Sequence, residues 1–169
     1  YGDEIAETLR ERESMPDAIS KVLDDIEPVM ELAAEFAGKR SVLFIGRHVG
    51  YPVALEGALK LKELAYIHAE GFAAGELKHG PIALIENQLP VFVVVPPRGR
   101  DMLHDKVVSN LQEIRARGAK TIVLAEEDDD EARGDPPHLL RGDGCDAVIV
   151  ALDLGDDLGR GSERRERGD

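Results

Sequence analysis

Three side chains that can move protons lie within one stretch of the chain, residues 56–81. Lys60 and Glu63 are three residues apart, so on a helix they lie on the same side, next to Glu56. His79 follows, directly before a Gly-Pro step. A carboxylate beside an ammonium group can act as a general acid or base, and so can an imidazole near neutral pH. The bland alternative is an exposed ion pair worth about 0.3–0.5 kcal/mol and a structural histidine.

The helix that must carry Lys60 and Glu63 is expected over residues 51–68, with Pro52 in its first turn, a favoured position. A step of about 100° per residue gathers its apolar side chains into one arc. This arc consists of Ala54, Leu55, Ala58, Leu59, Leu61, Ala65 and Tyr66. Lys62 falls inside the arc, so either its ammonium group reaches out to solvent or the helix is covered on more than one side.

Apolar runs predict the strands around this helix, and Gly46 and Pro96-Pro97 close the first two of them. The predicted strands are residues 41–46, 89–95, 120–125 and 147–152. An amphipathic helix is expected over residues 101–117. Strands that alternate with helices predict an α/β fold, a three-layer α/β/α sandwich around a mainly parallel sheet. Ligands bind such sheets beyond the carboxyl ends of the strands, here residues 46–50 and 96–100.

The glycines after the first predicted strand, Gly46 and Gly50, do not form the GxGxxG pattern of a dinucleotide-binding turn. The turn between them offers Arg47 and His48 as charges for a phosphate, or as ordinary solvated loop residues. It contains no Ser or Thr, the residue types that supply hydroxyl donors at a phosphate-binding helix N-terminus.

The ends of the chain differ from its centre in composition. Residues 1–38 read as a helical lead-in that packs beside the sheet, interrupted near Pro16, and residues 39–152 as the main domain. Residues 153–169 are rich in Gly, Arg and Asp and are predicted to be disordered. The acidic run 126–131, EEDDDE, is interpreted as a solvated loop. A divalent-cation site there is the alternative, although the glycine spacing of an EF-hand is missing.

Composition excludes several classes of function. The net charge is −13, without a basic patch, which is unfavourable for nucleic acid and for anionic membranes. No apolar run is long enough to span a bilayer. The single Cys145 argues against a disulfide framework and fits a reducing compartment such as the cytoplasm.

The sequence ALEGALKLKELAYIHAEGFAAGELKHGPIALIE strongly resembles the second sugar-isomerase (SIS) domain of the glucosamine-6-phosphate synthases, the isomerising glutamine–fructose-6-phosphate aminotransferases. The resemblance is strongest over residues 41–95 and weaker from about residue 9 to about 125. It implies a flavodoxin-like SIS fold and a part in making glucosamine-6-phosphate from fructose-6-phosphate and glutamine-derived ammonia. It implies no cofactor and no metal.

The resemblance also implies a role for each proton-moving residue. Glu63 matches the glutamate that transfers a proton between C1 and C2 of the sugar, and burial on the helix would raise the pKa of such a carboxyl group. Lys60 would stabilise charge on the developing enolamine oxygen. His79 matches the histidine that opens the sugar ring in the active site of a neighbouring subunit, which implies a homodimer.

Two parts of the family's site are not found in this sequence. Family members have a Ser/Thr-rich phosphate loop in their first SIS domain and a C-terminal segment with a lysine that closes over the sugar. We therefore expect the chain to be inactive alone and to need the first SIS and glutaminase domains. The alternative is a non-catalytic SIS module that binds a phosphosugar or a protein partner.

Overall fold

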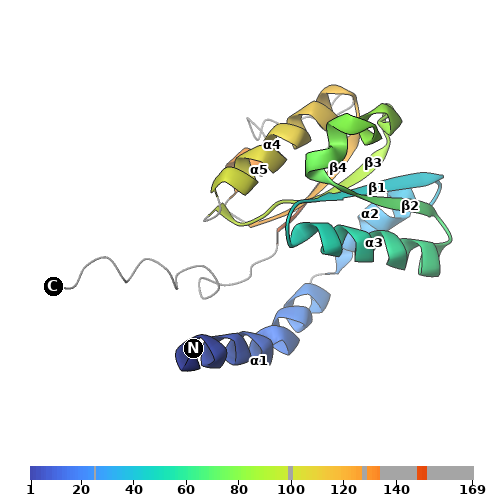
Figure 1. Ribbon diagram of the computed structural model, residues 1–169. Coiled ribbons are helices and arrows are strands. Elements are labelled where there is room, and N and C mark those ends of the chain that lie inside the picture. Colours follow the sequence, from blue (N-terminus) through green and yellow to red (C-terminus); the bar gives the residue numbers. More distant parts are fainter. Residues whose placement is uncertain (25, 99–100, 127–128, 134–147, 152–169) are drawn as a thin grey trace.

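Five parallel strands form the centre of the computed structural model (Figure 1), which describes residues 1–24, 26–98, 101–126, 129–133 and 148–151. The strands are β1 (Ser41–Gly46), β2 (His68–Ala73), β3 (Pro90–Val94), β4 (Lys120–Ala125) and β5 (Val148–Ala151). Their order in the sheet is β2-β1-β3-β4-β5, and every neighbouring pair runs parallel. This is the flavodoxin-like order, in which the chain reverses direction across the sheet between β1 and β3.

Side chains that alternate along β1 divide the core between two helical layers. Val42 and Phe44 pack with α3 (Gly50–Ala65) on one face of the sheet. Leu43 and Ile45 belong to the larger core on the other face. That face is covered by η1 (Ala74–His79), η2 (Pro81–Leu84), α4 (Asp101–Ala116) and α5 (Asp130–Arg133). The predicted three-layer α/β/α sandwich is therefore confirmed.

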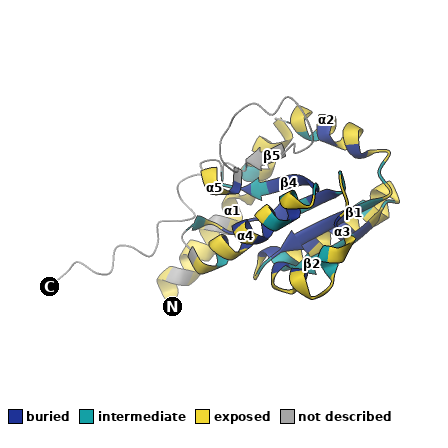
Figure 2. Ribbon diagram, turned by 90° about the horizontal axis from the view of Figure 1, so that it is seen from above, coloured by how far each residue is buried: buried dark blue, intermediate teal, exposed yellow. Residues whose placement is uncertain are grey.

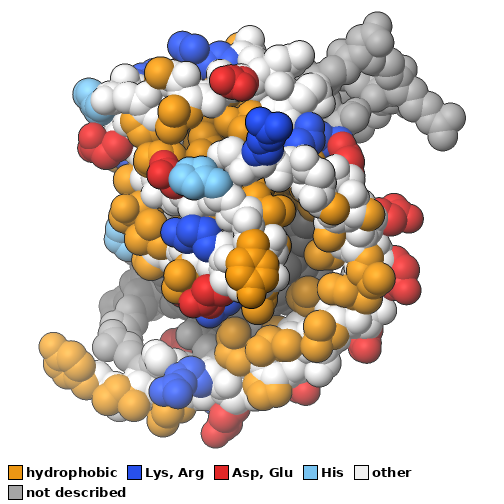
Figure 3. Space-filling view, turned by 90° about the vertical axis from the view of Figure 1, so that its right-hand side faces the viewer, with side chains coloured by type: hydrophobic (Ala, Val, Ile, Leu, Met, Phe, Trp, Pro, Cys, Tyr) orange, Lys and Arg blue, Asp and Glu red, His pale blue; other side chains and the backbone are white. Residues whose placement is uncertain are grey.

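Helix α3 lies close to the sheet because small residues face it. A Cβ atom at Gly57 would lie 2.7 Å from the Phe44 ring, and one at Gly71 would lie 2.9 Å from Leu55. The buried residues of α3 are Gly50, Ala54 and Ala58. The expected apolar arc is thus fully buried only at Ala54 and Ala58, with Leu61 half-buried against the same core. Other members of the arc are exposed, for example Tyr66 at 90%, and hydrophobic side chains (orange) are exposed on the side of the molecule that Figure 3 shows.

The N-terminal lead-in consists of two helices, α1 (Gly2–Asp24) and α2 (Glu27–Phe36). The predicted interruption near Pro16 is wrong, since α1 continues through this residue. α2 packs beside the sheet as expected, through Leu32 and Phe36. The side chains of α1 are almost all exposed, and in Figure 1 the helix extends away from the sheet, where Figure 2 colours it mainly yellow.

Strand β2 is missing from the sequence-based prediction, which extended the preceding helix to residue 68 and assigned no element to residues 69–73. Its sequence, HAEGFA, lacks the apolar run of a central strand because β2 is the edge strand and its residues facing α3, Ala69 and Gly71, must be small. The other four strands lie within one residue of their predicted bounds, as does α4. α3 ends three residues earlier than predicted.

The proposed boundaries of the lead-in and the main domain stay a prediction, and the tail 153–169 lies outside the described residues. Within the part of the chain that the structure describes, no helix is both long enough and apolar enough to cross a membrane.

Candidate functional site

Lys60 and Glu63 form a charged ridge with Glu56 on α3. The Lys60 Nζ atom lies 2.9 Å from Glu63 Oε2 and 3.4 Å from Glu56 Oε1. The hydrogen bond to Glu63 and then that to Glu56 raise the pKa of Lys60 above its ordinary value. Lys60 therefore remains an ammonium group at neutral pH and can stabilise negative charge rather than accept a proton.

The expected burial of Glu63 is wrong. Its side chain is 50% exposed, and that of Lys60 is 53% exposed. The cause is the narrow alanine side of α3, which contacts the sheet and leaves the adjacent ridge in solvent. Lys62 is exposed as well, so its ammonium group reaches solvent without a second covering layer. Both charged groups of the Lys60–Glu63 pair are therefore in contact with solvent.

His79 lies far from this ridge in the topology of the fold. Glu63 is close to the end of α3, just before β2 begins. His79 is the last residue of η1, which follows the other end of β2. η1 also packs on the opposite face, where Ala74 and Leu77 join the core of α4. The structure thus brings Lys60 and Glu63 together but does not bring His79 to them.

The position of His79 is fixed by contacts between η1 and α4. The buried Asn110 side chain donates a hydrogen bond of 2.6 Å to the Ala74 carbonyl. Lys78 Nζ lies 2.6 Å from Glu113 Oε1. The His79 side chain itself is exposed, as a group offered to another molecule must be.

The turn after β1 lies at the carboxyl edge of the sheet, where this fold binds ligands. Gly46 is required there, because a Cβ atom would overlap the backbone of Gly50. His48 has a left-handed backbone with a φ of 52° and is exposed, and Arg47 is half-buried. α3 begins without a side-chain cap, in line with the lack of hydroxyl residues in this turn.

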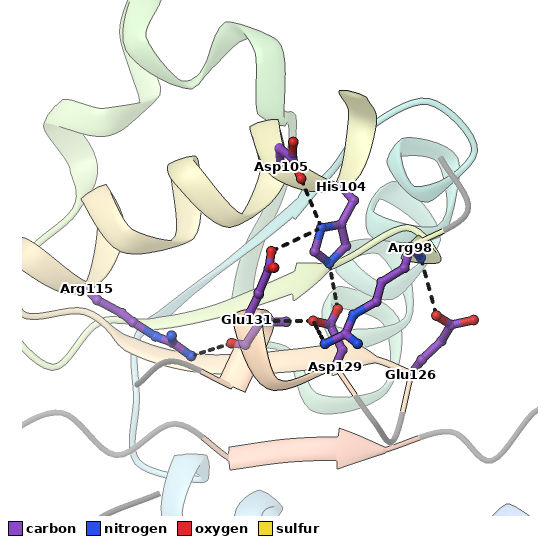
Figure 4. A network of polar contacts seen from close by, with 8 residues as sticks. Arg98, His104, Asp105, Arg115, Glu126, Asp129 and Glu131 are labelled. Atoms are coloured by element: carbon purple, nitrogen blue, oxygen red, sulfur yellow. Dashed lines mark hydrogen bonds and ion pairs between the residues drawn. The ribbon is translucent and has the colours of Figure 1, made fainter. Parts of the chain in front are cut away.

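A second polar cluster lies beyond the carboxyl ends of β3 and β4, and sequence reasoning missed it (Figure 4). His104 of α4 is 3% exposed, and its Nε2 atom lies 2.8 Å from Oδ2 of Asp129, whose side chain is 2% exposed. The other oxygen of Asp129 accepts a hydrogen bond of 3.0 Å from the Ala132 N–H, and Arg98 Nη2 lies 3.4 Å from it. The interpretation of residues 126–131 as a solvated loop is therefore wrong for Asp129, which is buried.

The electrostatics of this pair favour the charged forms. Burial alone lowers the pKa of His104, but the hydrogen bond and charge of Asp129 outweigh it and raise that pKa above its ordinary value. Burial alone raises the pKa of Asp129, but the Ala132 N–H, His104 and Arg98 together lower it. Each partner thus holds the other in its ionised state near pH 6.

A signal for this pair was present in the sequence. His104 occupies the same helical stripe as Val107, Val108 and Leu111, three, four and seven residues later, which are buried. An imidazole in the apolar stripe of a helix needs a polar partner. The acidic run that follows β4 is the segment from which a carboxylate can reach it.

The order of the strands is that of a known class of domain. Residues 35–140, more than half of the chain, match the SIS domain family, so the chain belongs to the SIS family.

Individual members of that family have amino-acid sequences similar to that of this chain. It is 66% identical over 142 residues to the isomerising glutamine–fructose-6-phosphate aminotransferase of Streptomyces coelicolor, and the match covers 83% of this chain and 23% of that protein. The corresponding Mycolicibacterium smegmatis protein is 64% identical over 141 residues, covering 83% and 22%. The chain thus spans about a quarter of the length of these relatives.

A solved structure agrees with the sequence matches. The C-terminal domain of glucosamine-fructose-6-phosphate aminotransferase from Francisella tularensis superimposes with a TM-score of 0.76 at 36% identity. The superposition covers 94% of this chain and 41% of that one.

Proposed function

We propose that this chain is part of an isomerase module that makes glucosamine-6-phosphate from fructose-6-phosphate and glutamine-derived ammonia. The observation that carries the proposal is the 66% identity over 142 residues to the aminotransferase of Streptomyces coelicolor. The reaction is a ketose–aldose isomerisation in amino sugar biosynthesis, and its setting is the cytoplasm.

The α3 ridge supplies the groups that this isomerisation needs. Glu63 removes a proton from C1 of the sugar and returns it at C2, which is general acid–base catalysis by one carboxylate. Lys60, held 2.9 Å from Glu63 and kept protonated by it, stabilises the negative charge that develops on the neighbouring oxygen. Glu56 orients Lys60 from the preceding turn of the helix.

The site is proposed to be completed by other polypeptide surfaces. A carboxylate that is half exposed is a weak base for a carbon acid, because water screens the charges around it. The first SIS domain covers the ridge and binds the phosphate, and the glutaminase domain supplies ammonia. His79 lies on the opposite face of the sheet, so in a homodimer it serves the active site of the other copy and opens the sugar ring there.

The test is a chimera in which residues 35–140 of this chain replace the matching segment of the Streptomyces coelicolor aminotransferase. We expect the chimera to form glucosamine-6-phosphate from fructose-6-phosphate and glutamine, while the 169-residue chain alone forms none. Isothermal titration of fructose-6-phosphate measures binding in both.

Two results would change the proposal. A folded chimera that binds fructose-6-phosphate without turnover would instead support a non-catalytic SIS module. Turnover by the chain alone would contradict the proposal that the site is incomplete.

A further inference from the structure

The buried His104 and two carboxylates place three atoms that can bind a metal ion close together. Its Nδ1 atom lies 3.5 Å from Asp105 Oδ1 and 3.9 Å from Glu131 Oε2. The three atoms all lie within 4.8 Å of one another. They line a cavity of about 140 Å³, together with Arg98 (Figure 4). The donors come from the first turns of α4 and α5, so the fold brings together two distant parts of the sequence.

The orientation of His104 is fixed by a partner on its far side. The Nε2 atom faces Asp129 Oδ2 at 2.8 Å, and both side chains are almost fully buried. If Nε2–H is the donor in this bond, Nδ1 presents its lone pair to the cavity. A histidine whose second nitrogen is held by a carboxylate is the usual arrangement around protein-bound metal ions, because the carboxylate fixes the ring and increases its basicity.

The spacing of the donors suits a small cation. Ligands of tetrahedral Zn²⁺ lie roughly 3.3 Å apart, given bond lengths of about 2.0–2.1 Å. The two contacts of Nδ1 are only slightly longer, and Asp105 and Glu131 are 72% and 66% exposed, so both can adjust. Three acceptor atoms at this distance repel one another unless a proton on Nδ1 or a cation lies between them. A proton on Nδ1 would be satisfied by one of these two carboxylates, whereas the second carboxylate and the cavity fit a cation.

We propose that His104, Asp105 and Glu131 bind a divalent transition-metal ion of the Zn²⁺ type. One imidazole and two carboxylates provide three protein ligands, and water fills the fourth position. Arg98 pairs with Asp129 at the rim of the cavity, and its positive charge opposes that of the ion and weakens the binding. The site does not involve the α3 ridge and does not depend on the proposed isomerase function.

The experiment uses the 169-residue chain labelled with ¹⁵N, at pH 7.5, titrated with Zn²⁺ alone. The ring nitrogens of each histidine are followed by long-range ¹H–¹⁵N NMR, because the many acidic residues elsewhere in this chain also attract cations. We expect the Nδ1 signal of His104 to move to the range of a metal-bound nitrogen, while Nε2 keeps its proton.

Surface variants provide the matched comparison. Asp105→Asn combined with Glu131→Gln changes two exposed side chains, so the fold is retained, and we expect Zn²⁺ binding at His104 to weaken at least about tenfold. His68→Asn is the control: it removes an exposed histidine that lies 3.5 Å from a single carboxylate, Glu70, and leaves binding at His104 unchanged.

Two results would overturn the proposal. One is a His104 ring that stays doubly protonated, or unshifted, at an excess of Zn²⁺. The other is equal Zn²⁺ affinity at His104 in the double variant and the original chain. Either result would mean that the carboxylates serve only to hold a charged imidazole.

Discussion

The α3 ridge and the His104–Asp129 pair are two groups of charged side chains with opposite environments. Lys60 and Glu63 are about half exposed, although their contact of 2.9 Å is short. His104 and Asp129 are 3% and 2% exposed at nearly the same distance, 2.8 Å. Distance alone therefore does not distinguish the two pairs, but the surrounding solvent does.

This difference shows which of the two groups has all its polar partners within one copy of the chain. The His104–Asp129 pair has a full set of partners within one copy, from Arg98, the Ala132 N–H and the first turn of α4. Among the residues that the structure describes, the charged groups of the α3 ridge have ion-pair partners only on their own helix. Catalysis by electrostatic stabilisation needs a water-excluded site, so in this account the ridge becomes a catalytic centre only under another surface.

The largest expected effect concerns Glu63 in the chimera with the Streptomyces coelicolor protein. Glu63→Gln removes the proposed base and is expected to lower kcat by roughly 10²–10⁴-fold, with little change in KM for fructose-6-phosphate. Glu56→Gln, one acidic position earlier on the same ridge, is the control and should change kcat by less than about tenfold. Steady-state assays of glucosamine-6-phosphate formation measure both, and unchanged turnover in Glu63→Gln would remove this residue from the mechanism.

A smaller effect is expected for the buried pair, on stability. Asp129→Asn leaves a buried imidazole without its counter-charge and should lower the free energy of unfolding by about 3 kcal/mol, near the lower end for a broken buried pair. Asp130→Asn, the exposed neighbour, should change it by less than about 0.5 kcal/mol. Urea unfolding of the chain measures both variants, and equal midpoints would show that the pair does not stabilise the fold.

The smallest effect is the pH dependence of the same pair, measured with a chelator present. The pKa of His104 is raised from 6.5, so its contribution to stability is complete below about pH 6.5 and is lost as the pH rises through the folded-state pKa. The pKa of Asp129 is lowered from 3.8, so its contribution is complete above about pH 3.8 and is lost as the pH falls through the folded-state pKa. The stability difference between the original chain and Asp129→Asn should thus be largest between these two values. A difference that does not vary with pH would contradict the ionised pair.

The sequence predicted the sheet well because four strands are continuous apolar runs of the length of a buried strand. It missed β2 because an edge strand under a closely packed helix is built from Ala and Gly. Burial was also expected for Glu63 beside the apolar residues of its helix. Only Ala54 and Ala58 of the arc are fully buried, with Leu61 half-buried against the same core, and Glu63 stays half exposed. Periodicity identifies an apolar side of a helix, whereas the distance between helix and sheet, set here by Gly57 and Gly71, decides how much of it is buried.

The candidate site was predictable only in part for a related reason. Lys60 and Glu63 are neighbours on one helix, so their contact follows from spacing alone. The pair of His104 and Asp129 spans 25 residues and two elements, so it depends on the sheet register that places the end of β4 beside α4. Non-local pairs of this kind require the fold before they can be recognised.

The central claim is that one copy of this chain does not complete the site, because Glu63 and His79 lie on opposite faces of its sheet. Mixing subunits of two inactive chimeras, Glu63→Gln and His79→Asn, tests this most directly. If Glu63 of one copy works with His79 of the other, half of the mixed subunits form heterodimers with one intact site each, and activity should return to about a quarter of the original. If both residues act within one copy, every site in the mixture carries a defect, and activity would stay at the level of the separate variants.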